Sequence, residues 1–270
     1  MVELITSSQN RMVKLASSLS QKKYRDETGL FLLEGIRLVE EAVQSGWRLE
    51  CCLVTAEARL KDRVVNMLEQ LHSQNVKLLE VTDEIFSKLS ETEQPQGILS
   101  IARKKEYTLA DILTGEEPPL IAVLESVQDP GNVGALIRTA DAAGCSGVIL
   151  TKGCADIYSG KTVRATMGSL FHLPIITGLD GGEAVEALKL NNIALFATSL
   201  ATRNLYHDVN MNRPSAIVFG NEGSGVRAEI LQAADELMYI PIYGKAESLN
   251  VSASAAVILF EAVRQRRTVL

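Results

Sequence analysis

The sequence predicts an α/β protein in which a smaller α/β domain precedes a larger one built on a mostly parallel sheet. Short apolar runs, which fit buried strands, alternate with segments of helical period along the chain. A polar stretch, Glu116-Glu-Pro-Pro119, interrupts this alternation and is typical of an extended linker. We therefore expect domains at residues 1–105 and 119–270, joined by residues 106–118.

The first domain is predicted to open with an amphipathic helix over residues 6–20. Further along, Leu60, Val64, Met67 and Leu71 recur at helical spacing and define one buried face. Strands are expected at 29–34, 47–55, 76–81 and 97–103, and helices at 35–44, 59–72 and 82–89.

The second domain repeats the alternation. Strands are expected at 120–124, 147–150, 173–176, 193–198, 215–219 and 237–242. Helices are expected at 131–143, 183–190, 226–234 and 249–266, with a helical turn at 161–167.

Composition excludes several classes of protein. No apolar run approaches the roughly 18 residues of a membrane span, and the N-terminus lacks the apolar core of a secretory signal. The four cysteines form no disulfide framework, which favours a reducing cytoplasm. The three histidines are far apart in sequence, so no metal site is expected.

The net charge of −6 argues against indiscriminate coating of nucleic acid but leaves room for local basic patches. One cluster lies near the N-terminus and another follows the predicted strand 97–103. A solvated face is the competing interpretation of each cluster. The candidate phosphate contacts are Arg11, Lys14, Lys22, Lys23, Arg25, Arg103, Lys104 and Lys105.

A polar segment, Glu125–Asp141, follows the first strand of the second domain, where open α/β sheets place their sites. Asp129 is expected to cap a helix with Pro130 in its first turn. Arg138 lies about 140° from the apolar stripe of that helix at 100° per residue, so it is not a core residue. A surface arginine without function is the alternative.

Two more polar loops follow strands. In Val218–Val226, Gly220, Gly223 and Gly225 permit close backbone approach to a ligand. In the stretch from Ile240, a polar loop enters a helix rich in small residues, and Ser248 is a plausible N-cap. An ordinary glycine turn and an ordinary capped helix are the alternatives.

Other nucleotide and nucleophile motifs are poor matches. The order G-x-x-G-x-G at 220–225 differs from the dinucleotide fingerprint. Ser159-Gly-Lys-Thr162 has the wrong spacing for a P-loop and no preceding strand. The chain has no G-x-S-x-G elbow of a serine hydrolase.

Taken in order, the three loops resemble the SpoU family of RNA ribose 2′-O-methyltransferases, within the SPOUT superfamily. The first motif is Asp129–Arg138, the second is Val218–Gly225, and the third is Ile240–Ile242 with Glu247–Ser252. Residues 1 to about 105 are similar to the family's substrate-binding domain, a ribosomal-protein-like α/β module, through Ser7–Asn10, Phe31–Gly35 and Thr92–Gly97.

The resemblance implies a deep trefoil knot in the second domain, S-adenosylmethionine (AdoMet) as cofactor, and a homodimer. It also implies that strand ends and loops of the second domain line the cofactor pocket. The matching positions are Thr198, Ser199, Leu200, Phe219, Gly220, Asn221, Glu222, Gly223, Ile240, Pro241, Ile242, Ser248, Leu249 and Asn250.

By the same resemblance, Arg138 would activate the 2′-hydroxyl, assisted by Asn132, Glu222, Ser248 and Asn250. A guanidinium with a pKa above about 12 is a poor base. We therefore expect Arg138 to orient the hydroxyl and grip a phosphate, with Glu222 holding it by a charge-assisted pair. The basic clusters become candidate contacts to the RNA backbone, with selection by RNA shape or loops.

Two other functions stay open at this stage. One is a non-catalytic RNA-binding or ribosome-assembly factor that keeps the knot. The presence of all the candidate catalytic residues disfavours it. The other is a nucleotide-cofactor enzyme on an ordinary doubly wound sheet, which the missing fingerprint disfavours. The target nucleotide, and whether it lies in ribosomal or transfer RNA, does not follow from the sequence.

Overall fold

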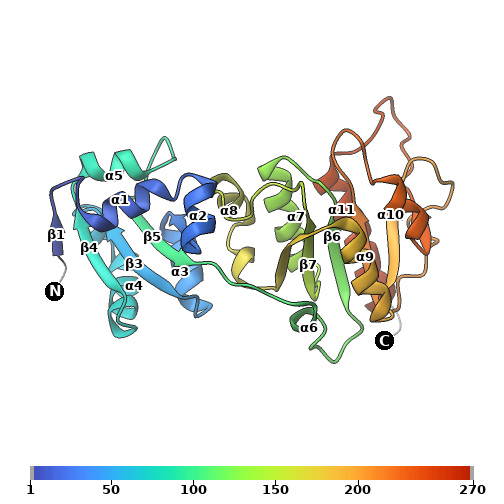
Figure 1. Ribbon diagram of the computed structural model, residues 1–270, viewed down its shortest axis with the longest axis horizontal. Coiled ribbons are helices and arrows are strands. Elements are labelled where there is room, and N and C mark those ends of the chain that lie inside the picture. The colour runs from blue at the N-terminus through green and yellow to red at the C-terminus, as the bar shows by residue number, and fades with distance from the viewer. Residues whose placement is uncertain (1–2, 268–270) are drawn as a thin grey trace. The chain divides into compact units, whose positions relative to one another are not determined.

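The computed structural model describes residues 3–267 and divides into two compact units (Figure 1). The N-terminal unit comprises the residues up to Lys105 together with Asp156–Phe171, and the C-terminal unit comprises the rest. The first break between the units falls at the boundary expected near residue 105, whereas Asp156–Phe171, expected in the second domain, packs with the N-terminal unit. A segment from the middle of the chain returns to the N-terminal unit.

The N-terminal sheet is mixed, whereas the alternation of strands and helices in residues 1–105 favours a mostly parallel sheet. Its order is β1-β4-β3-β5-β2, and β5 runs antiparallel to both neighbours. The strands are β1 (Glu3–Ile5), β2 (Leu30–Glu34), β3 (Leu49–Val54), β4 (Lys77–Val81) and β5 (Ile98–Arg103).

Helices cover both faces of this sheet, because strand side chains alternate in direction. Cys51 and Leu53 of β3 lie in one apolar core with Val13 and Phe86 of α1 and α5. Helices α3 and α4 pack against each other and against other strands of the sheet. The helices are α1 (Arg11–Ser18), α2 (Lys22–Thr28), α3 (Ile36–Gln44), α4 (Asp62–Ser73) and α5 (Asp83–Leu89).

The N-terminal boundary of the first helix differs from the prediction. Helix α1 begins at Arg11 because the Asn10 side chain caps it, accepting a hydrogen bond of 2.8 Å from the backbone N–H of Met12. The preceding residues form β1 and a turn instead of helix, and α2 was not predicted.

Aromatic side chains fix the returning segment to the N-terminal unit. Tyr158 stacks on Phe31, with ring centroids 4.6 Å apart, and Phe171 meets Trp47 edge-on at 5.1 Å. The segment contains α8 (Gly160–Thr166), which matches the expected helical turn, and a short 3₁₀ turn at Ser169–Phe171. Arg164 of α8 is not free for a ligand, since it pairs with Glu91 at 3.1 Å.

The C-terminal sheet is parallel throughout, as predicted. Its order is β11-β9-β10-β6-β7-β8, so the chain runs outward from β6 through β7 to β8, and on the other side β10 lies between β6 and the earlier strand β9. The expected deep knot stays a prediction. The strands are β6 (Leu120–Leu124), β7 (Gly147–Thr151), β8 (Ile175–Leu179), β9 (Ala194–Thr198), β10 (Ser215–Phe219) and β11 (Glu236–Met238).

Helices α7 (Pro130–Ala142) and α11 (Val251–Arg267) pack side by side (Figure 1). Helices α9 (Gly181–Leu190) and α10 (Ala228–Ala233) share a separate core with the sheet. The predicted linker is partly ordered: it contains α6 (Leu109–Ile112), and the side chain of Ile112 is buried in that core.

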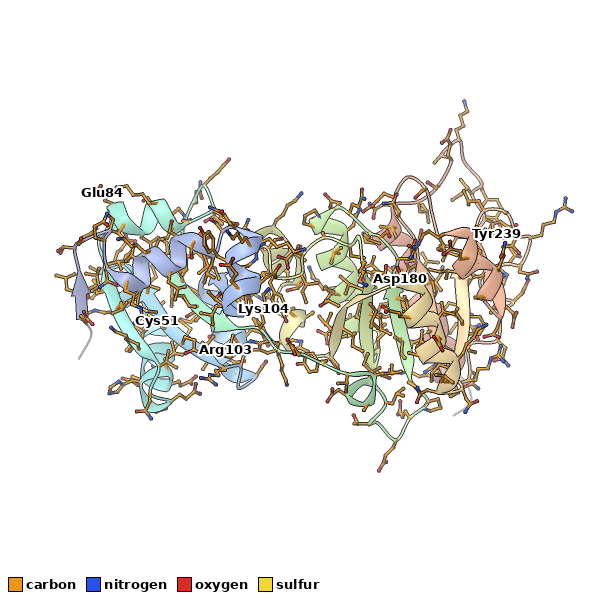
Figure 2. All side chains as sticks on the ribbon, viewed as in Figure 1. Cys51, Glu84, Arg103, Lys104, Asp180 and Tyr239 are labelled. Carbon is orange, nitrogen blue, oxygen red and sulfur yellow. The ribbon has the colours of Figure 1, made fainter. Side chains whose placement is uncertain are left out.

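Several of the predicted RNA contacts are engaged within the protein, and three of them form short ion pairs. Arg25 is buried, pairs with Asp156 at 2.7 Å and donates to the carbonyls of Leu19 and Ser20, so its prediction as an RNA contact is wrong. Figure 2 labels Arg103 and Lys104, whose cations form ion pairs with Glu50 and Asp26 at 2.8 and 2.7 Å.

Neither a membrane span nor a metal-binding cluster appears in the part of the chain that the structure describes. No helix within residues 3–267 is long and apolar enough to cross a bilayer. No group of three or more His, Cys, Asp or Glu side chains in the same range is arranged to hold a metal ion.

We predict that Arg25→Gln destabilises the N-terminal unit by about 3 kcal/mol, because it removes a buried guanidinium and leaves the half-buried Asp156 carboxylate without its cation. Lys22→Gln, at an exposed position of the same helix, should change the free energy of unfolding by less than about 0.5 kcal/mol. Urea unfolding followed by fluorescence of the single Trp47, which lies in this unit, measures both. Equal stability of the two variants would contradict the structural role of Arg25.

Candidate active site

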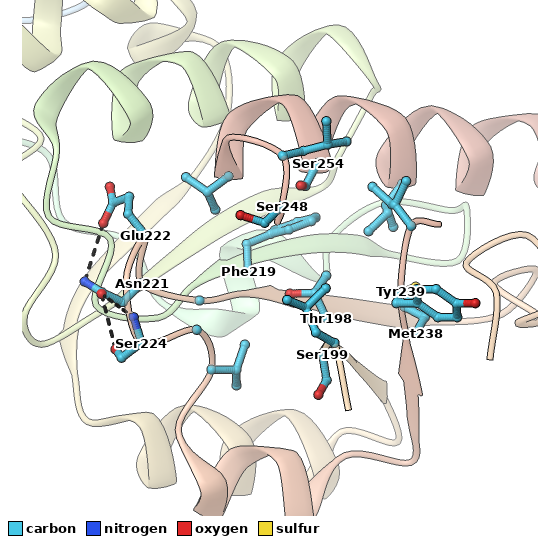
Figure 3. A pocket seen from close by; sticks show the side chains of 18 of the residues that line it. Thr198, Ser199, Phe219, Asn221, Glu222, Ser224, Met238, Tyr239, Ser248 and Ser254 are labelled. Carbon is cyan, nitrogen blue, oxygen red and sulfur yellow. Dashed lines mark hydrogen bonds between the residues drawn. The ribbon is translucent and has the colours of Figure 1, made fainter. Parts of the chain in front are cut away.

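A cavity of about 550 Å³ opens at the carboxyl ends of three neighbouring strands in the C-terminal unit (Figure 3). Thr198, Phe219 and Met238 end β9, β10 and β11 and all line it. Such a position is the usual ligand site of a parallel α/β sheet. Its volume lies within the roughly 300–1,000 Å³ of pockets for small molecules and cofactors.

The predicted pocket residues gather here almost completely. All fourteen except Pro241 line the cavity. Gly225, which the sequence marks for close approach to a ligand, also lines it. Further lining residues were missed, because periodicity marks a residue as buried without saying that it faces a cavity. They are Ala201, Ser224, Val226, Leu231, Met238, Tyr239, Val251, Ser254 and Ile258.

The second motif forms a closed loop against the cavity. The backbones of Asn221 and Gly225 exchange two hydrogen bonds of 3.0 Å. This fold brings Gly225 so close that a Cβ on Gly220 would lie 2.2 Å from its carbonyl carbon. The Asn221 side chain accepts hydrogen bonds from the N–H groups of Gly223 and Ser224 at 3.0 and 3.1 Å. The loop is thus fixed by its own polar groups before any ligand binds.

The three motifs are joined by one chain of side-chain hydrogen bonds, which we call the relay. The Asn132 amide donates to Glu222 at 2.9 Å and accepts from the Asn250 amide at 2.9 Å. Asn250 in turn accepts from the backbone N–H of Ser252 at 2.9 Å, at the start of α11. Three residues far apart in sequence therefore connect the first, second and third motifs beside the cavity.

Glu222 is the acceptor at one end of the relay. Besides Asn132, it accepts from the backbone N–H groups of Gln128 and Asp129, both at 3.1 Å. Partial burial raises the pKa of this carboxyl, but the hydrogen bonds from Asn132 and the backbone outweigh it and lower the pKa below the ordinary 4.5. A carboxylate so well satisfied is a weak base and serves to hold the loops together.

The helix cap in the third motif lies two residues later than expected. Helix α11 begins at Val251, and Asn250, not Ser248, accepts from the first free N–H groups. Ser248 instead lines the cavity (Figure 3). Asn250 thus has two roles, as helix cap and as relay member.

Arg138 is exposed on α7, as its position outside the apolar stripe predicted. The expected ion pair with Glu222 is not found, because backbone and amide donors occupy that carboxylate. Arg138 makes no hydrogen bond or ion pair with any residue in 3–267, and it does not line the cavity. Its guanidinium is therefore available to a ligand outside the cavity.

A buried ion pair beside the site was not predicted. Glu125, fully buried at the end of β6, accepts from Nε of Arg227 at 2.6 Å, and this bond raises the pKa of Arg227. Arg227 follows the second motif, so the pair ties that loop to the residue directly after β6, which precedes the first motif. A glutamate after an apolar strand was visible in the sequence, but its partner, 102 residues away, was not.

The cysteines are poor nucleophiles. Burial raises the pKa of Cys51, Cys52 and Cys145 to about 12 and that of Cys154 to about 11. At neutral pH these thiols stay protonated, and the thiolate is the reactive form. The site therefore has no cysteine suited to covalent catalysis.

We predict that Glu222→Gln lowers stability at neutral pH and that the difference from wild type shrinks in acid. The folded pKa of Glu222 lies below its ordinary value of 4.5, so its contribution is present above 4.5 and is lost as the pH falls below it. Chemical unfolding at several pH values measures this. The exposed Glu229→Gln is the control, and a difference that does not change with pH would contradict the role of the carboxylate.

Comparison with known proteins agrees with this geometry. Residues 119–260 match the SpoU rRNA Methylase family, and residues 10–100 match the MRM3-like substrate binding domain. The chain is 36% identical to the 23S rRNA (guanosine(2553)-2′-O)-methyltransferase RlmP of Bacillus subtilis, over 95% of this chain and 97% of that protein.

Solved structures are similar over the same length. An AdoMet-bound rRNA methyltransferase from Sinorhizobium meliloti superposes with a TM-score of 0.88 at 34% identity, covering 100% of this chain and 99% of that one. The SpoU methyltransferase AviRb from Streptomyces viridochromogenes, in complex with AdoMet, gives 0.86 at 28% identity, covering 96% and 100%. The α/β fold with a parallel sheet and the family expected from the three motifs are confirmed: the chain belongs to the SpoU rRNA methylase family.

Proposed function

We propose that the protein transfers a methyl group from AdoMet to a ribose 2′-hydroxyl of ribosomal RNA. The relay supports this most directly, since it joins the three family motifs around a cavity of cofactor size. The relatives add the substrate class: the similar Bacillus protein is named as a 2′-O-methyltransferase of 23S rRNA, and two similar structures hold AdoMet.

The cavity residues suit AdoMet, which has an apolar adenine face and a charged amino-acid end. Apolar side chains, including Leu231, Leu249 and Ile258, form part of the wall and fit the adenine. Backbone groups of the second motif and the strand ends offer hydrogen bonds to polar atoms, and Gly220 and Gly223 let a ligand approach the main chain. When bound, AdoMet supplies an electrophilic methyl group on a sulfonium.

In the reaction, the ribose 2′-oxygen forms a bond to the methyl carbon as the sulfur–carbon bond breaks, and the hydroxyl proton leaves to water or an RNA phosphate. Arg138 does not accept that proton, because a guanidinium stays charged in proteins. Its unpaired charge suits it to grip an RNA phosphate and turn the 2′-hydroxyl toward the cofactor. Much of the rate then comes from positioning.

Asn132, Glu222 and Asn250 act on the site through the relay. They fix the second and third motifs relative to α7, which carries Arg138, and so set the geometry of cofactor and hydroxyl together. Ser248 lines the cavity and is a candidate donor to the ribose. The complete relay disfavours a non-catalytic RNA-binding factor, which has no need to preserve these positions.

Arg11, Lys14, Lys22, Lys23 and Lys105 remain proposed contacts to the RNA backbone. Arg11 and Lys14 support the proposal best, because both are exposed on α1 and neither has an ion-pair partner among residues 3–267. A reducing cytoplasm is the proposed location, in keeping with four free cysteines, and fractionation of the native host would test it.

We predict that Arg138→Ala binds AdoMet with an affinity close to that of wild type, because the arginine lies outside the cavity. Methyl transfer should fall by about 100-fold or more, because the 2′-hydroxyl is no longer positioned. Calorimetry with AdoMet and labelled-methyl incorporation into rRNA measure the two effects. Mapping of the product must place the label on ribose. Methyl transfer by Arg138→Ala at the wild-type rate, or a label on the base, would contradict the proposed chemistry.

A homodimer is the proposed active unit. Helix α11 leaves Val257 and Phe260 exposed by 37% and 48%, three residues apart on one helix, and Leu249 just before the helix is exposed by 40%. Apolar side chains grouped in this way fit a second copy of the chain.

We predict that the protein sediments at twice its chain mass of 29.3 kDa and that Phe260→Asp shifts it toward the monomer, because a charge would be buried in the interface. The exposed Leu190→Asp on α9 is the matched control. A monomeric wild type at the concentrations used for methyl transfer would refute the dimer.

A further inference from the structure

A second hollow, separate from the cofactor cavity, lies in the N-terminal unit between α1 and α5. We call it the N-terminal groove; its volume is about 420 Å³. The two helices pack against each other along the sheet (Figure 1), and Val13, Ile85 and Leu89 are the buried apolar residues that line it. Gln21 and Tyr24, at the start of α2, also line the groove.

One side of the groove is a polar stripe along α1. Lys14, Ser17, Ser18 and Gln21 are spaced by three or four residues, so they follow one flank of the helix into the turn after it. The buried Val13 and Ala16 occupy the neighbouring flank. The stripe is therefore fixed by the same packing that holds α1 on the sheet.

Several polar groups of the groove have no partner within the described chain. The side chains of Gln9, Ser17 and Gln21 and the hydroxyl of Tyr24 make no hydrogen bond with residues 3–267. They offer both donors and acceptors, which suits the edges of nucleobases and the 2′-hydroxyl of RNA.

The charge of the groove is positive, although the whole chain carries −6. Lys14 has no ion-pair partner in residues 3–267, while Lys88 on the facing helix is paired with Glu84 at 2.7 Å. Arg11 lies one helical turn before Lys14 and is also unpaired. Lys14 is thus the cation best placed to meet a phosphate here.

Tyr24 contributes an aromatic ring at the groove. It is 36% exposed on the short helix α2, and Nζ of Lys23 lies 5.8 Å from the centre of its ring. Exposed aromatic rings next to lysines are the platform on which proteins stack unpaired bases. A duplex offers no such base, because its bases are already stacked on one another.

We propose that the N-terminal groove binds an unpaired nucleotide of the substrate RNA, with the base on Tyr24 and a phosphate on Lys14. This rests on the proposed function for the identity of the RNA, and it adds where and in which form the RNA is held. Single-stranded loops, rather than helical segments, are then what the N-terminal unit selects.

The test compares variants of the full-length protein in binding to a fluorescein-labelled oligouridylate, read by anisotropy. Tyr24→Leu removes the ring and should weaken binding by about five-fold or more, whereas Tyr24→Phe keeps the ring and should stay within about two-fold. Lys14→Gln should reduce the slope of log affinity against log salt by about 0.7, the value for one phosphate of a single strand.

Controls separate this proposal from others. Lys61→Gln, an exposed lysine near α4 in the same unit, should leave the salt slope unchanged. An RNA duplex of equal length should bind the wild type and Tyr24→Leu alike. Equal binding of the oligouridylate by Tyr24→Leu and wild type, or a salt slope unaffected by Lys14→Gln, would overturn the groove as a nucleotide site.

The same preparations are assayed for AdoMet binding and for methyl transfer to rRNA. If the wild type transfers methyl groups but the groove variants bind RNA as the wild type does, only the proposal for the groove is refuted. Absence of AdoMet binding by the wild type refutes the proposed function, whatever the groove binds. Thermal melting of each variant confirms that any lost binding does not come from unfolding.

Discussion

The C-terminal unit depends on one hydrogen-bonded chain, from Glu222 through Asn132 to Asn250. Each member lies in a loop at the carboxyl end of the sheet or at the start of a helix that follows it. Loops of this kind are usually the mobile parts of an α/β protein. Here the carboxylate of Glu222 also takes up two backbone N–H groups before α7, so three loops behave as one polar assembly. The cavity keeps its form because two of its lining residues, Glu222 and Asn250, are joined through Asn132.

The parallel sheet makes this arrangement possible, since it brings the ends of β6, β9, β10 and β11 to one edge. The buried pair of Glu125 and Arg227 supports the same edge from within the protein. Removing one member of such a pair is costly, while the pair itself adds little net stability. The pair fixes where the second motif lies relative to the end of β6. The N-terminal unit takes no part in the relay. Its helices carry exposed cations and Tyr24 on a mixed sheet.

The sequence predicted most strands and the motif residues, because burial and loop chemistry both leave local patterns. It failed where a partner lies far along the chain. Arg25 looked like one more exposed cation, and only the return of Asp156 to the N-terminal unit makes it a buried anchor. Serine and asparagine are both favoured as helix N-caps, so the sequence does not distinguish Ser248 from Asn250. In the structure Asn250 is the cap, and its amide also donates to Asn132. The antiparallel β5 follows from tertiary pairing that no apolar run encodes. Glu222 was expected to hold Arg138, yet nearer backbone donors satisfy it.

The central claim is that the relay couples the three motifs, and a double-mutant cycle on AdoMet affinity tests it most directly. Asn250→Asp keeps a good helix cap but loses the amide that donates to Asn132, and Asn132→Ala removes the acceptor. If the relay couples the motifs, the double variant should lose less affinity than the sum of the single losses, with a coupling of about 0.5–3 kcal/mol. Single losses that add within about 0.3 kcal/mol would contradict the account.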